Sequence, residues 1–499
     1  MAETYLLGID LGAGSLKATL VTQAGVVKAT SSAPVSTFVR HFGWAEQDPA
    51  EWFAALCKAV PETIAKAAIN PTQIAGIGLS AGAHIPVLTD AAGTVLRPAI
   101  MWSDQRAAKQ AADLHQRAGE QIIKTGLNRV NPTWTLSMLA WLKAQEPDVM
   151  AKAKKLYLAK DFLRHCLTGS WETDYSDAVG ALLADDSTKN WSKELADLIG
   201  LDMSILPPIV PATQIVGGVT EQAAALTGLF AGTPVVCGSN DTTVEFFGVG
   251  GNKPGIGGVK LATAGVLFLA TEGVQVHPPI SCYPHIIPGL YYAATGTNSC
   301  ASAHRWVRDL MFAEGGFEDM DRLASAAPRG AGGLLFHPYL QGERAPYWDP
   351  LLRADFVGMT ISHEHRHFAR AVYEGIAFSI RDLLSAACEQ GFQFSTIRLM
   401  GGGAQSACWR QIIADVTGLM IERTAEADAS FGSALVAGLG VGLFANPEDA
   451  QTRCIHLKDT AIPQPDASAF YTQLFGLYKE SQAALAGINH KLHALTTSF

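Results

Sequence analysis

Residues 5–21 read YLLGIDLGAGSLKATLV, and this stretch sets the expectation for the fold. The apolar runs 5–10 and 16–21 predict two strands, and the small residues between them predict a tight turn. After a glycine-rich connection at 248–258, the stretch 259–271 reads VKLATAGVLFLAT and repeats that pattern. The recurrence of a strand, a small-polar turn and a strand predicts a duplicated domain, with chance similarity as the alternative.

The rest of the chain mixes helical and strand patterns in sequence, which predicts an α/β or mixed-sheet fold. Asp48 and Pro49 are typical of a helix start, as N-cap and first helical residue. The longest amphipathic pattern predicts a helix that is capped by Ser362 and stopped by Gly391. Further strands are expected at 74–79, 234–238 and 397–400, and further helices at 107–126 and 406–418.

Length and composition restrict the class of protein. A chain of 499 residues, with 48% hydrophobic and 17% charged residues, predicts a globular protein of two or three domains. The net charge of -9 gives no general attraction to nucleic acid or to an anionic membrane. Eight cysteines without a CxxC pair, no signal peptide, and no apolar run of about 18 residues predict a soluble cytoplasmic protein with reduced thiols.

The first turn is a candidate phosphate site. Small residues at Gly12, Ala13, Gly14 and Ser15 let an anion approach the backbone N–H groups, and Lys17 adds positive charge. An ordinary β-hairpin is the alternative interpretation. Asp10 favours the functional one, because a buried carboxylate beside this turn needs a partner, and Mg²⁺ is the usual companion of phosphates.

Two later segments carry candidate chemistry. Asp241 follows the apolar run 234–238 and is either a general base or a helix N-cap, roles that are compatible. The GGGA turn at 401–404 resembles a dinucleotide fingerprint only in part, because Ser406 stands at the place of the third glycine. No P-loop motif is present. The histidines at 363, 365 and 367 are expected to be solvated rather than metal ligands.

Several motifs, taken together, resemble the FGGY carbohydrate kinases over almost the whole chain. They are GIDLG at 8–12, WSDQR at 102–106, GSND at 238–241, LATAG at 261–265, YLQGERAP at 339–346 and GGGA at 401–404. Within that family the chain is most similar to xylulokinases, on the segments 44–49, 160–163 and 401–418.

The resemblance implies an α/β fold of two actin-like (ribonuclease-H-like) domains that flank an interdomain cleft. It implies a sugar-binding domain at 1–248, a nucleotide-binding domain at 249–450 and a helical tail at 451–499. The implied activity is transfer of the γ-phosphoryl group of ATP to a hydroxyl of a small carbohydrate, with D-xylulose as the first candidate. Gluconate, ribulose, another sugar or polyol, or a catalytically silent sugar sensor are the alternatives. The implied partners are the sugar and ATP, without nucleic acid or membrane, and a homodimer is compatible with the family.

The resemblance also assigns roles to individual residues. Asp241 would be the general base, and Asp10 and Asp241 would hold Mg²⁺. Phosphates of ATP would contact Gly12, Ala13, Gly14, Ser15, Lys17, Thr263 and Gly265. The adenosine would contact Gly402, Gly403, Ala404 and Ser406. The sugar would contact His84, Ala83, Trp102, Asp104 and Thr242.

The departures from the family pattern lie mainly at the sugar end. Xylulokinases resemble one another in a Gln-Met-His-Gly run where this chain has Gly82, Ala83, His84 and Ile85. Loss of two larger side chains predicts open space there, and a substrate that is bulkier than xylulose or differently substituted. Thr242 replaces an asparagine, and alanines replace hydroxyl residues in both phosphate turns.

Overall fold

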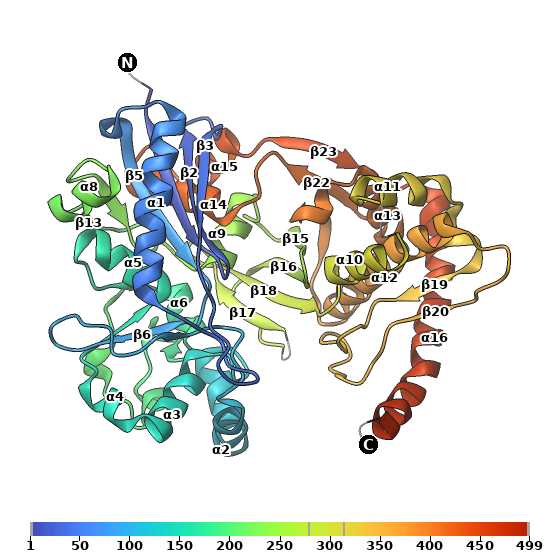
Figure 1. The fold of residues 1–499 in the computed structure, drawn as a ribbon, viewed down its shortest axis with the longest axis horizontal. Helices are drawn as coiled ribbons and strands as arrows, with labels where there is room; N and C mark the ends of the chain where they lie inside the picture. Colours follow the sequence, from blue (N-terminus) through green and yellow to red (C-terminus); the bar gives the residue numbers. More distant parts are fainter. Residues whose placement is uncertain (1–2, 278–279, 313–314, 497–499) are drawn as a thin grey trace. The chain divides into compact units, whose positions relative to one another are not determined.

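The computed structural model describes residues 3–277, 280–312 and 315–496, and it has the mixed α/β fold expected from the sequence (Figure 1). The chain divides into two compact units. The first contains Met1–Asn252, Glu272–Tyr292 and Glu426–His456, and the second contains Lys253–Thr271, Ala293–Ala425 and Leu457–Phe499. The sequence-domain boundaries drawn at 248 and 450 stay a prediction.

The opening stretch forms the centre of the first sheet. β1 (Tyr5–Leu11) and β2 (Ser15–Thr22) pair antiparallel, as a tight turn between them requires, and this confirms the predicted strands. β5 (Ile74–Ala81) lies parallel to β1 on its other side. The full order is β13-β14-β5-β1-β2-β3, with β3 at Val27–Pro34, β13 at Ile215–Gly218 and β14 at Pro234–Val236.

The second sheet repeats this arrangement around the second hairpin. β15 (Gly255–Leu261) pairs antiparallel with β16 (Gly265–Glu272) and parallel with β21 (Phe394–Met400). β22 (Met420–Thr424) is parallel to β21 and antiparallel to β23 (Leu457–Ala461). The order β16-β15-β21-β22-β23 therefore matches β2-β1-β5-β14-β13 strand for strand and direction for direction. The predicted duplication is confirmed at the level of topology.

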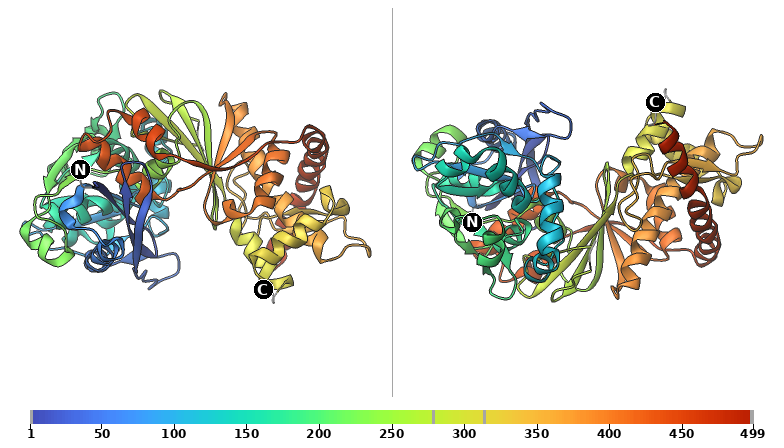
Figure 2. Two further views of the ribbon diagram at one scale, coloured as in Figure 1. Left: turned by 90° about the horizontal axis from the view of Figure 1, so that it is seen from above. Right: turned by 90° about the horizontal axis from the view of Figure 1, so that it is seen from below.

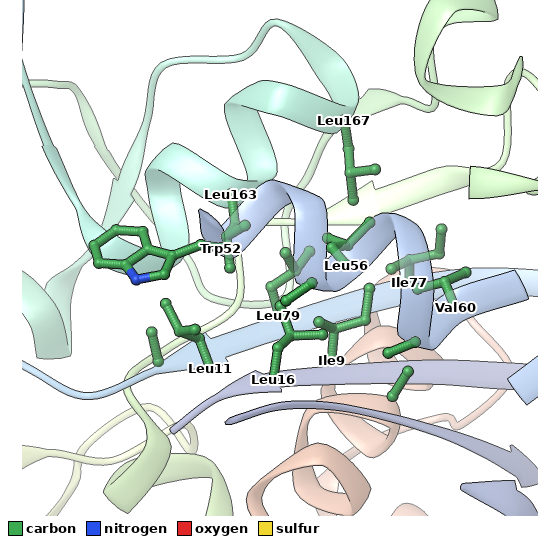
Figure 3. Packing of buried hydrophobic residues seen from close by; sticks show 14 of the residues in the cluster. Ile9, Leu11, Leu16, Trp52, Leu56, Val60, Ile77, Leu79, Leu163 and Leu167 are labelled. Atoms are coloured by element: carbon green, nitrogen blue, oxygen red, sulfur yellow. The ribbon is translucent and has the colours of Figure 1, made fainter. Parts of the chain in front are cut away.

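The core of the first unit lies between the first sheet and helix α1 (Pro49–Ala67). Asp48 is the N-cap of α1, as predicted, and its carboxylate accepts from the Ala50 N–H at 2.9 Å. Figure 3 shows how side chains from β1, β2 and β5 meet α1 and α5 (Ala159–Thr168). The labelled members are Ile9, Leu11, Leu16, Trp52, Leu56, Val60, Ile77, Leu79, Leu163 and Leu167.

Helix α14 (Ala429–Gly440) packs against β1 and β5 so closely that only glycine fits in the strands. A Cβ at Gly8 would lie 1.7 Å from the Ser430 carbonyl oxygen, and one at Gly78 would lie 2.1 Å from that of Ser433. Figure 2 shows the orange-red helices of this part of the chain beside the blue strands of the first unit. Gly8 in the opening stretch is thus required by a helix more than 400 residues later.

The remaining elements extend the two units. In the first, the helices are α2 (Ala108–Gly126), α3 (Thr135–Gln145), α4 (Pro147–Lys152), α6 (Tyr175–Gly180), α7 (Lys193–Leu198), α8 (Glu221–Thr227), α9 (Asp241–Gly248) and α15 (Pro447–Cys454). In the second, they are α10 (Ala301–Met311), α11 (Phe317–Ala326), α12 (His365–Glu389), α13 (Ala407–Thr417) and α16 (Pro465–Thr496).

Short strands complete the structure. They are β4 (Glu46–Gln47), β6 (Pro86–Thr89), β7 (Ala99–Ile100), β8 (Lys155–Leu158), β9 (Thr173–Asp174), β10 (Ala184–Asp185), β11 (Asn190–Trp191), β12 (Ile209–Val210), β17 (Ser281–Pro284), β18 (Leu290–Thr297), β19 (Leu335–His337) and β20 (Asp355–Val357). Among the residues described, no helix is both long enough and apolar enough to cross a membrane.

The start of α12 differs from the prediction. The helix begins at His365 and is capped by Glu364, whose N–H donates to Nδ1 of His367 at 3.0 Å. Ser362 is not the cap, because its hydroxyl bonds to that of Thr360 at 2.7 Å. The expectation of a solvated histidine is therefore wrong for His367, which is buried, whereas His365 is exposed. Gly391 follows the helix end with φ 89°, as a stop residue requires.

Candidate active site

Asp241 is the first residue of α9, directly after the segment that leaves β14. The N-cap of this helix is Asn240, whose side-chain oxygen accepts from the Thr243 N–H at 3.0 Å. The capping role that the sequence left open for Asp241 therefore belongs to its neighbour. Oδ1 of Asp241 accepts from the Thr242 N–H at 2.7 Å. This N–H and the positive end of the helix dipole stabilise negative charge on the carboxylate.

Asp10 lies near the end of β1 in strongly acidic surroundings. Its Oδ1 accepts from the hydroxyl of Ser80 on β5 at 2.7 Å. Burial raises the pKa of Asp10 well above its usual value, and the charges of Asp241, Asp428 and Glu245 raise it further, against the opposing hydrogen bond from Ser80. Local negative charge of this kind favours a bound cation.

Lys17 forms an ion pair beside Asp10. The β1–β2 register places Lys17 opposite Asp10, and its Nζ lies 2.5 Å from Oδ2 of Asp428, the N-cap of α14. Burial opposes ionisation of Asp428, but Lys17 and the hydrogen bonds from Ser430 outweigh it, so the pKa of Asp428 is lowered. The expected contact of Lys17 with phosphate stays a prediction.

The β1–β2 turn, where the sequence predicts a phosphate site, is held by hydrogen bonds and is open outward. The Gly12 N–H donates to the Ser15 carbonyl at 3.0 Å, and the Ala13 carbonyl accepts from Nε2 of Gln47 at 2.7 Å. Ala13 and Gly14 are exposed, and a Cβ at Gly14 would meet no atom within 4 Å. The turn thus offers accessible backbone, as an anion site needs.

His84 is the centre of a buried aromatic cluster at the expected sugar end. Its ring stacks on Trp134 with centroids 4.5 Å apart. Nδ1 lies 2.5 Å from the Gly180 carbonyl, which only accepts, so Nδ1 carries the proton and Nε2 accepts from the Tyr283 hydroxyl at 3.3 Å. Burial lowers the pKa of His84 to about 4, and the imidazole is neutral at pH 7. Its φ of 70° is uncommon for a residue other than glycine.

The other residues expected at the sugar end differ in accessibility. Trp102 is 47% exposed, and a Cβ at Gly82 would lie 3.1 Å from Cδ1 of its indole. The expectation of open space beside Gly82 is therefore wrong, because the indole lies there. Ala83 and Thr242 are half-buried, and the Thr242 hydroxyl lies 3.2 Å from Oδ1 of Asp241.

Asp104 has a structural environment. It is buried, and each of its carboxylate oxygens accepts two hydrogen bonds from protein donors. Oδ2 accepts from the Ala45 N–H and from Arg106 Nη2, and Oδ1 accepts from the N–H and Nε of Arg106. Contact of Asp104 with a sugar stays a prediction, and such a contact would compete with these four bonds.

In the second unit, the turn between β15 and β16 repeats the first phosphate turn. Thr263 is exposed, and its carbonyl accepts from the Ser302 hydroxyl at 2.7 Å. Gly265 is buried, and a Cβ there would lie 2.7 Å from Cγ2 of Thr297. Thr263 is thus the accessible member of this pair.

The GGGA turn separates into open and packed positions. Gly402 is exposed and a Cβ there would meet no atom within 4 Å, whereas one at Gly403 would lie 2.8 Å from both Leu261 and Trp409. Ala404 is buried. Ser406 caps α13 by accepting from the Trp409 N–H at 3.0 Å, and its hydroxyl donates to Asp321 at 2.8 Å.

This contrast predicts different results for two neighbouring glycines. Gly402→Ala is expected to keep the wild-type Tm but to raise KM for ATP about tenfold, since crowding of a packed contact costs on the order of 1–3 kcal/mol. Gly403→Ala is expected to lower Tm, because its Cβ overlaps buried side chains. Gly476→Ala, at an open position of α16, is the matched control and should leave KM unchanged. An unchanged KM in Gly402→Ala would contradict adenosine packing at this turn.

Sequence reasoning missed several neighbours of the predicted residues. Ser80 directly follows the strand predicted at 74–79, and a polar residue at a strand end is the signal that identified Asp10 and Asp241, so the sequence contained the information. Asp428 lies more than 400 residues from Lys17, and Trp134 and Tyr283 come from separate segments around His84. No short motif connects these residues, and only the folded chain brings them together.

Comparison with known proteins points to one family. The model of the FGGY family of carbohydrate kinases, N-terminal domain, matches residues 5–248, and that of the C-terminal domain matches residues 263–441. A xylulose kinase of Lactococcus lactis subsp. lactis is 32% identical over 493 residues, which cover 98% of each chain. An L-xylulose/3-keto-L-gulonate kinase of Escherichia coli is 30% identical, again over 98% of each chain.

A solved structure shares the whole architecture. The crystal structure of a protein described as a xyloylose kinase from Brucella ovis has a TM-score of 0.89 and 31% identity, and the match covers 97% of this chain and 100% of that one. Two family models and two nearly full-length matches at 31% and 32% identity thus agree with the repeated sheets. The chain belongs to the FGGY family of carbohydrate kinases.

Proposed function

We propose that this chain is an ATP-dependent kinase that phosphorylates D-xylulose. The observation that carries the proposal is the carboxylate of Asp241 at the N-terminus of α9, whose charge raises the pKa of Asp10. The names of the full-length relatives support xylulose over gluconate, ribulose and other polyols. A cytoplasmic location is part of the proposal, supported by eight free cysteines.

In the proposed reaction, Asp241 takes the proton of a sugar hydroxyl while that oxygen attacks the γ-phosphorus of ATP. A bond forms between the sugar oxygen and phosphorus, the bond from phosphorus to the β–γ bridging oxygen breaks, and ADP leaves with the electron pair. The accessible turns at Gly12–Ser15 and at Thr263 would contact phosphates of ATP. Phosphoryl transfer asks a protein mainly for positioning and for neutralisation of charge.

Mg²⁺ fits the acidic end of the first sheet. Burial, and then the charges of Asp241, Asp428 and Glu245, raise the pKa of Asp10, and carboxylate oxygens are the protein ligands that Mg²⁺ prefers. Among the described residues, no group of three or more His, Cys, Asp or Glu side chains could hold a metal alone. Asp10 and Asp241 would therefore share the ion with phosphates and water. When bound, Mg²⁺ would neutralise charge on the phosphates.

His84 would help to orient the sugar. It is neutral at pH 7, and Nε2 is an acceptor that already bonds to one hydroxyl, that of Tyr283. Because Nε2 has one lone pair, a substrate hydroxyl that binds there would take the place of the Tyr283 hydroxyl. The stack on Trp134 and the bond to Gly180 fix the ring, so the acceptor points in one direction.

The test is release of ADP from ATP and Mg²⁺ with a panel of ketopentoses, aldonic acids, polyols and ketohexoses. D-xylulose is expected to give the highest kcat/KM, and Asp241→Ala should abolish that turnover. A higher kcat/KM for another member would replace xylulose as substrate. Absence of turnover with every member, with ATP still bound, would refute the kinase proposal for this panel, and ligand-induced shifts of Tm would then identify a sensor.

The contact between Gly82 and Trp102 predicts a change in sugar binding alone. Gly82→Met is expected to displace the indole, because a Cβ already lies 3.1 Å from Cδ1, and to raise KM for the sugar about tenfold. KM for ATP should stay the same, since the three atoms nearest to a Cβ at Gly82 belong to Trp102 and Ile85 and not to the turn at 12–15. Initial rates at varied sugar and varied ATP separate the two constants. Equal changes in both would contradict a role of Trp102 in sugar binding.

A further inference from the structure

The segment 237–240, which carries Asp241 at its end, is held by buried side chains from other parts of the first unit. The Cys237 carbonyl accepts from Arg164 Nη1 at 2.8 Å. The Ser239 hydroxyl donates to Oδ2 of Asp174 at 2.7 Å, and the Asn240 amide donates to the Ser176 hydroxyl at 3.0 Å. Three hydrogen bonds on four residues hold the segment before α9 more tightly than the backbone alone would.

These attachments converge on one buried lysine. Lys160, which is 1% exposed, has Nζ at 2.5 Å from Asp161 and at 3.0 Å from both Asp174 and Asp177. Arg164 shares Asp161 with it, at 2.7 Å. Lys160 thereby orients Asp174, the carboxylate that holds Ser239.

The second branch of the network ends at the cap of α9. Ser176 is buried, and its hydroxyl bonds to the Asn240 amide and, at 2.9 Å, to the Thr243 hydroxyl. Thr243 in turn bonds to Asn240 Oδ1 at 2.8 Å and to the Tyr292 hydroxyl at 2.9 Å. Both residues of the capping interaction, Asn240 and Thr243, are thus bonded to Ser176.

Among the carboxylates around Lys160, Asp177 has a raised pKa. Burial raises the pKa of Asp177 to about 8; Lys160 opposes this shift, and Asp174 and Asp161 add to it. The ion pairs of Lys160 hold these buried carboxylates in place, which suits a positioning role.

We propose that Lys160, Asp174 and Ser176 form a positioning network that sets the orientation of the Asp241 carboxylate. The proposal rests on the proposed role of Asp241 as general base. None of the three residues is assigned a contact with substrate. A base works only within hydrogen-bond reach of the proton that it removes, so a small rotation of the α9 N-terminus would lower kcat and leave nucleotide binding unchanged.

The decisive variant is Ser176→Ala, which removes one buried hydroxyl. It is expected to lower kcat between about tenfold and hundredfold, with KM for ATP within about twofold of wild type. Thr63→Val is the matched control. Thr63 lies in α1, is equally buried, donates to the carbonyls of Ala18 in β2 and Ala59 in α1, and lies outside the network. The control is expected to change Tm to a similar extent without a change in kcat.

A double-mutant cycle separates positioning from general damage. In the Asp241→Asn background, Ser176→Ala should cause no further loss of kcat, because the group that it orients is already absent. An additive loss, or a wild-type kcat in Ser176→Ala alone, would overturn the proposal. Should Ser176→Ala fail to fold, Asp174→Asn, which keeps the side-chain shape, takes its place with the same expected results. Wild-type turnover in Asp241→Asn alone would instead overturn the base assignment.

Discussion

Replacement of Asp241 by asparagine is expected to lower kcat by about 10² or more, since loss of a general base typically costs that much. The side chain keeps its shape, and its oxygen still accepts from the Thr242 N–H, so the start of α9 should remain intact. The amide cannot take the proton of the sugar hydroxyl. ADP affinity should stay near wild type, because Asp241 is one carboxylate among several at this end of the sheet.

The control for this variant removes a carboxylate from the first residue of a different helix. Glu221 is the first residue of α8 and is exposed, so Glu221→Gln should leave kcat unchanged. Steady-state rates give kcat, calorimetric titration gives ADP affinity, and thermal unfolding shows that both variants fold. Wild-type turnover in Asp241→Asn would remove Asp241 from the role of base. Loss of both turnover and Tm would indicate that its function is structural.

Local signals in the sequence were sufficient for much of the fold. The opening hairpin, the second hairpin and the helix after Asp48 depend on periodicity, small turn residues and capping, and all three are confirmed. The predicted start of α12 was wrong because the cap is formed by Glu364 together with His367. Neither residue type is among the usual N-cap residues, so the sequence did not indicate this cap. The docking of α14 on Gly8 joins segments far apart in the chain, so no local pattern reveals it.

In the candidate site, too, some residues could be identified from local sequence and others only from the folded structure. Asp10 and Asp241 were identified because each ends an apolar strand pattern, which is a local feature. The ion pair of Lys17 with Asp428, the stack of Trp134 on His84 and the position of the Trp102 indole over Gly82 depend on tertiary contacts. The open space expected at Gly82 was wrong for this reason, since removal of a side chain in sequence does not show which neighbour fills its place.

Asp10→Asn is expected to lower turnover by at least about 10², because a metal ion contributes several kcal/mol to charge stabilisation in the transition state. The same substitution is expected to raise Tm at neutral pH without Mg²⁺. Asparagine can still accept from Ser80, and it removes a carboxylate that burial and three neighbouring acids disfavour in its charged form. Activity and stability should therefore change in opposite directions.

The pH dependence follows from the direction of the shift. An aspartate in the unfolded chain titrates near about 3.9, whereas in the folded protein the pKa of Asp10 is raised well above that. Between the two values Asp10 binds more protons in the folded state than in the unfolded state, so its contribution to the stability of the wild-type protein falls as pH rises from about 4. The Tm advantage of Asp10→Asn should thus be absent at about pH 4 and grow toward neutral pH.

Thermal unfolding in EDTA at a series of pH values, repeated with Mg²⁺ and ADP, measures both effects. Mg²⁺ and ADP should raise the Tm of the wild-type protein and should have a smaller effect on the variant, because ligands stabilise only the state that binds them. Asp113→Asn, at an exposed position of α2, is the control and should show neither change. An equal Tm for wild type and Asp10→Asn at every pH would contradict the acidic surroundings of Asp10. A higher Tm with lost turnover would exclude misfolding as the cause of inactivity, which assigns the loss to the missing carboxylate itself.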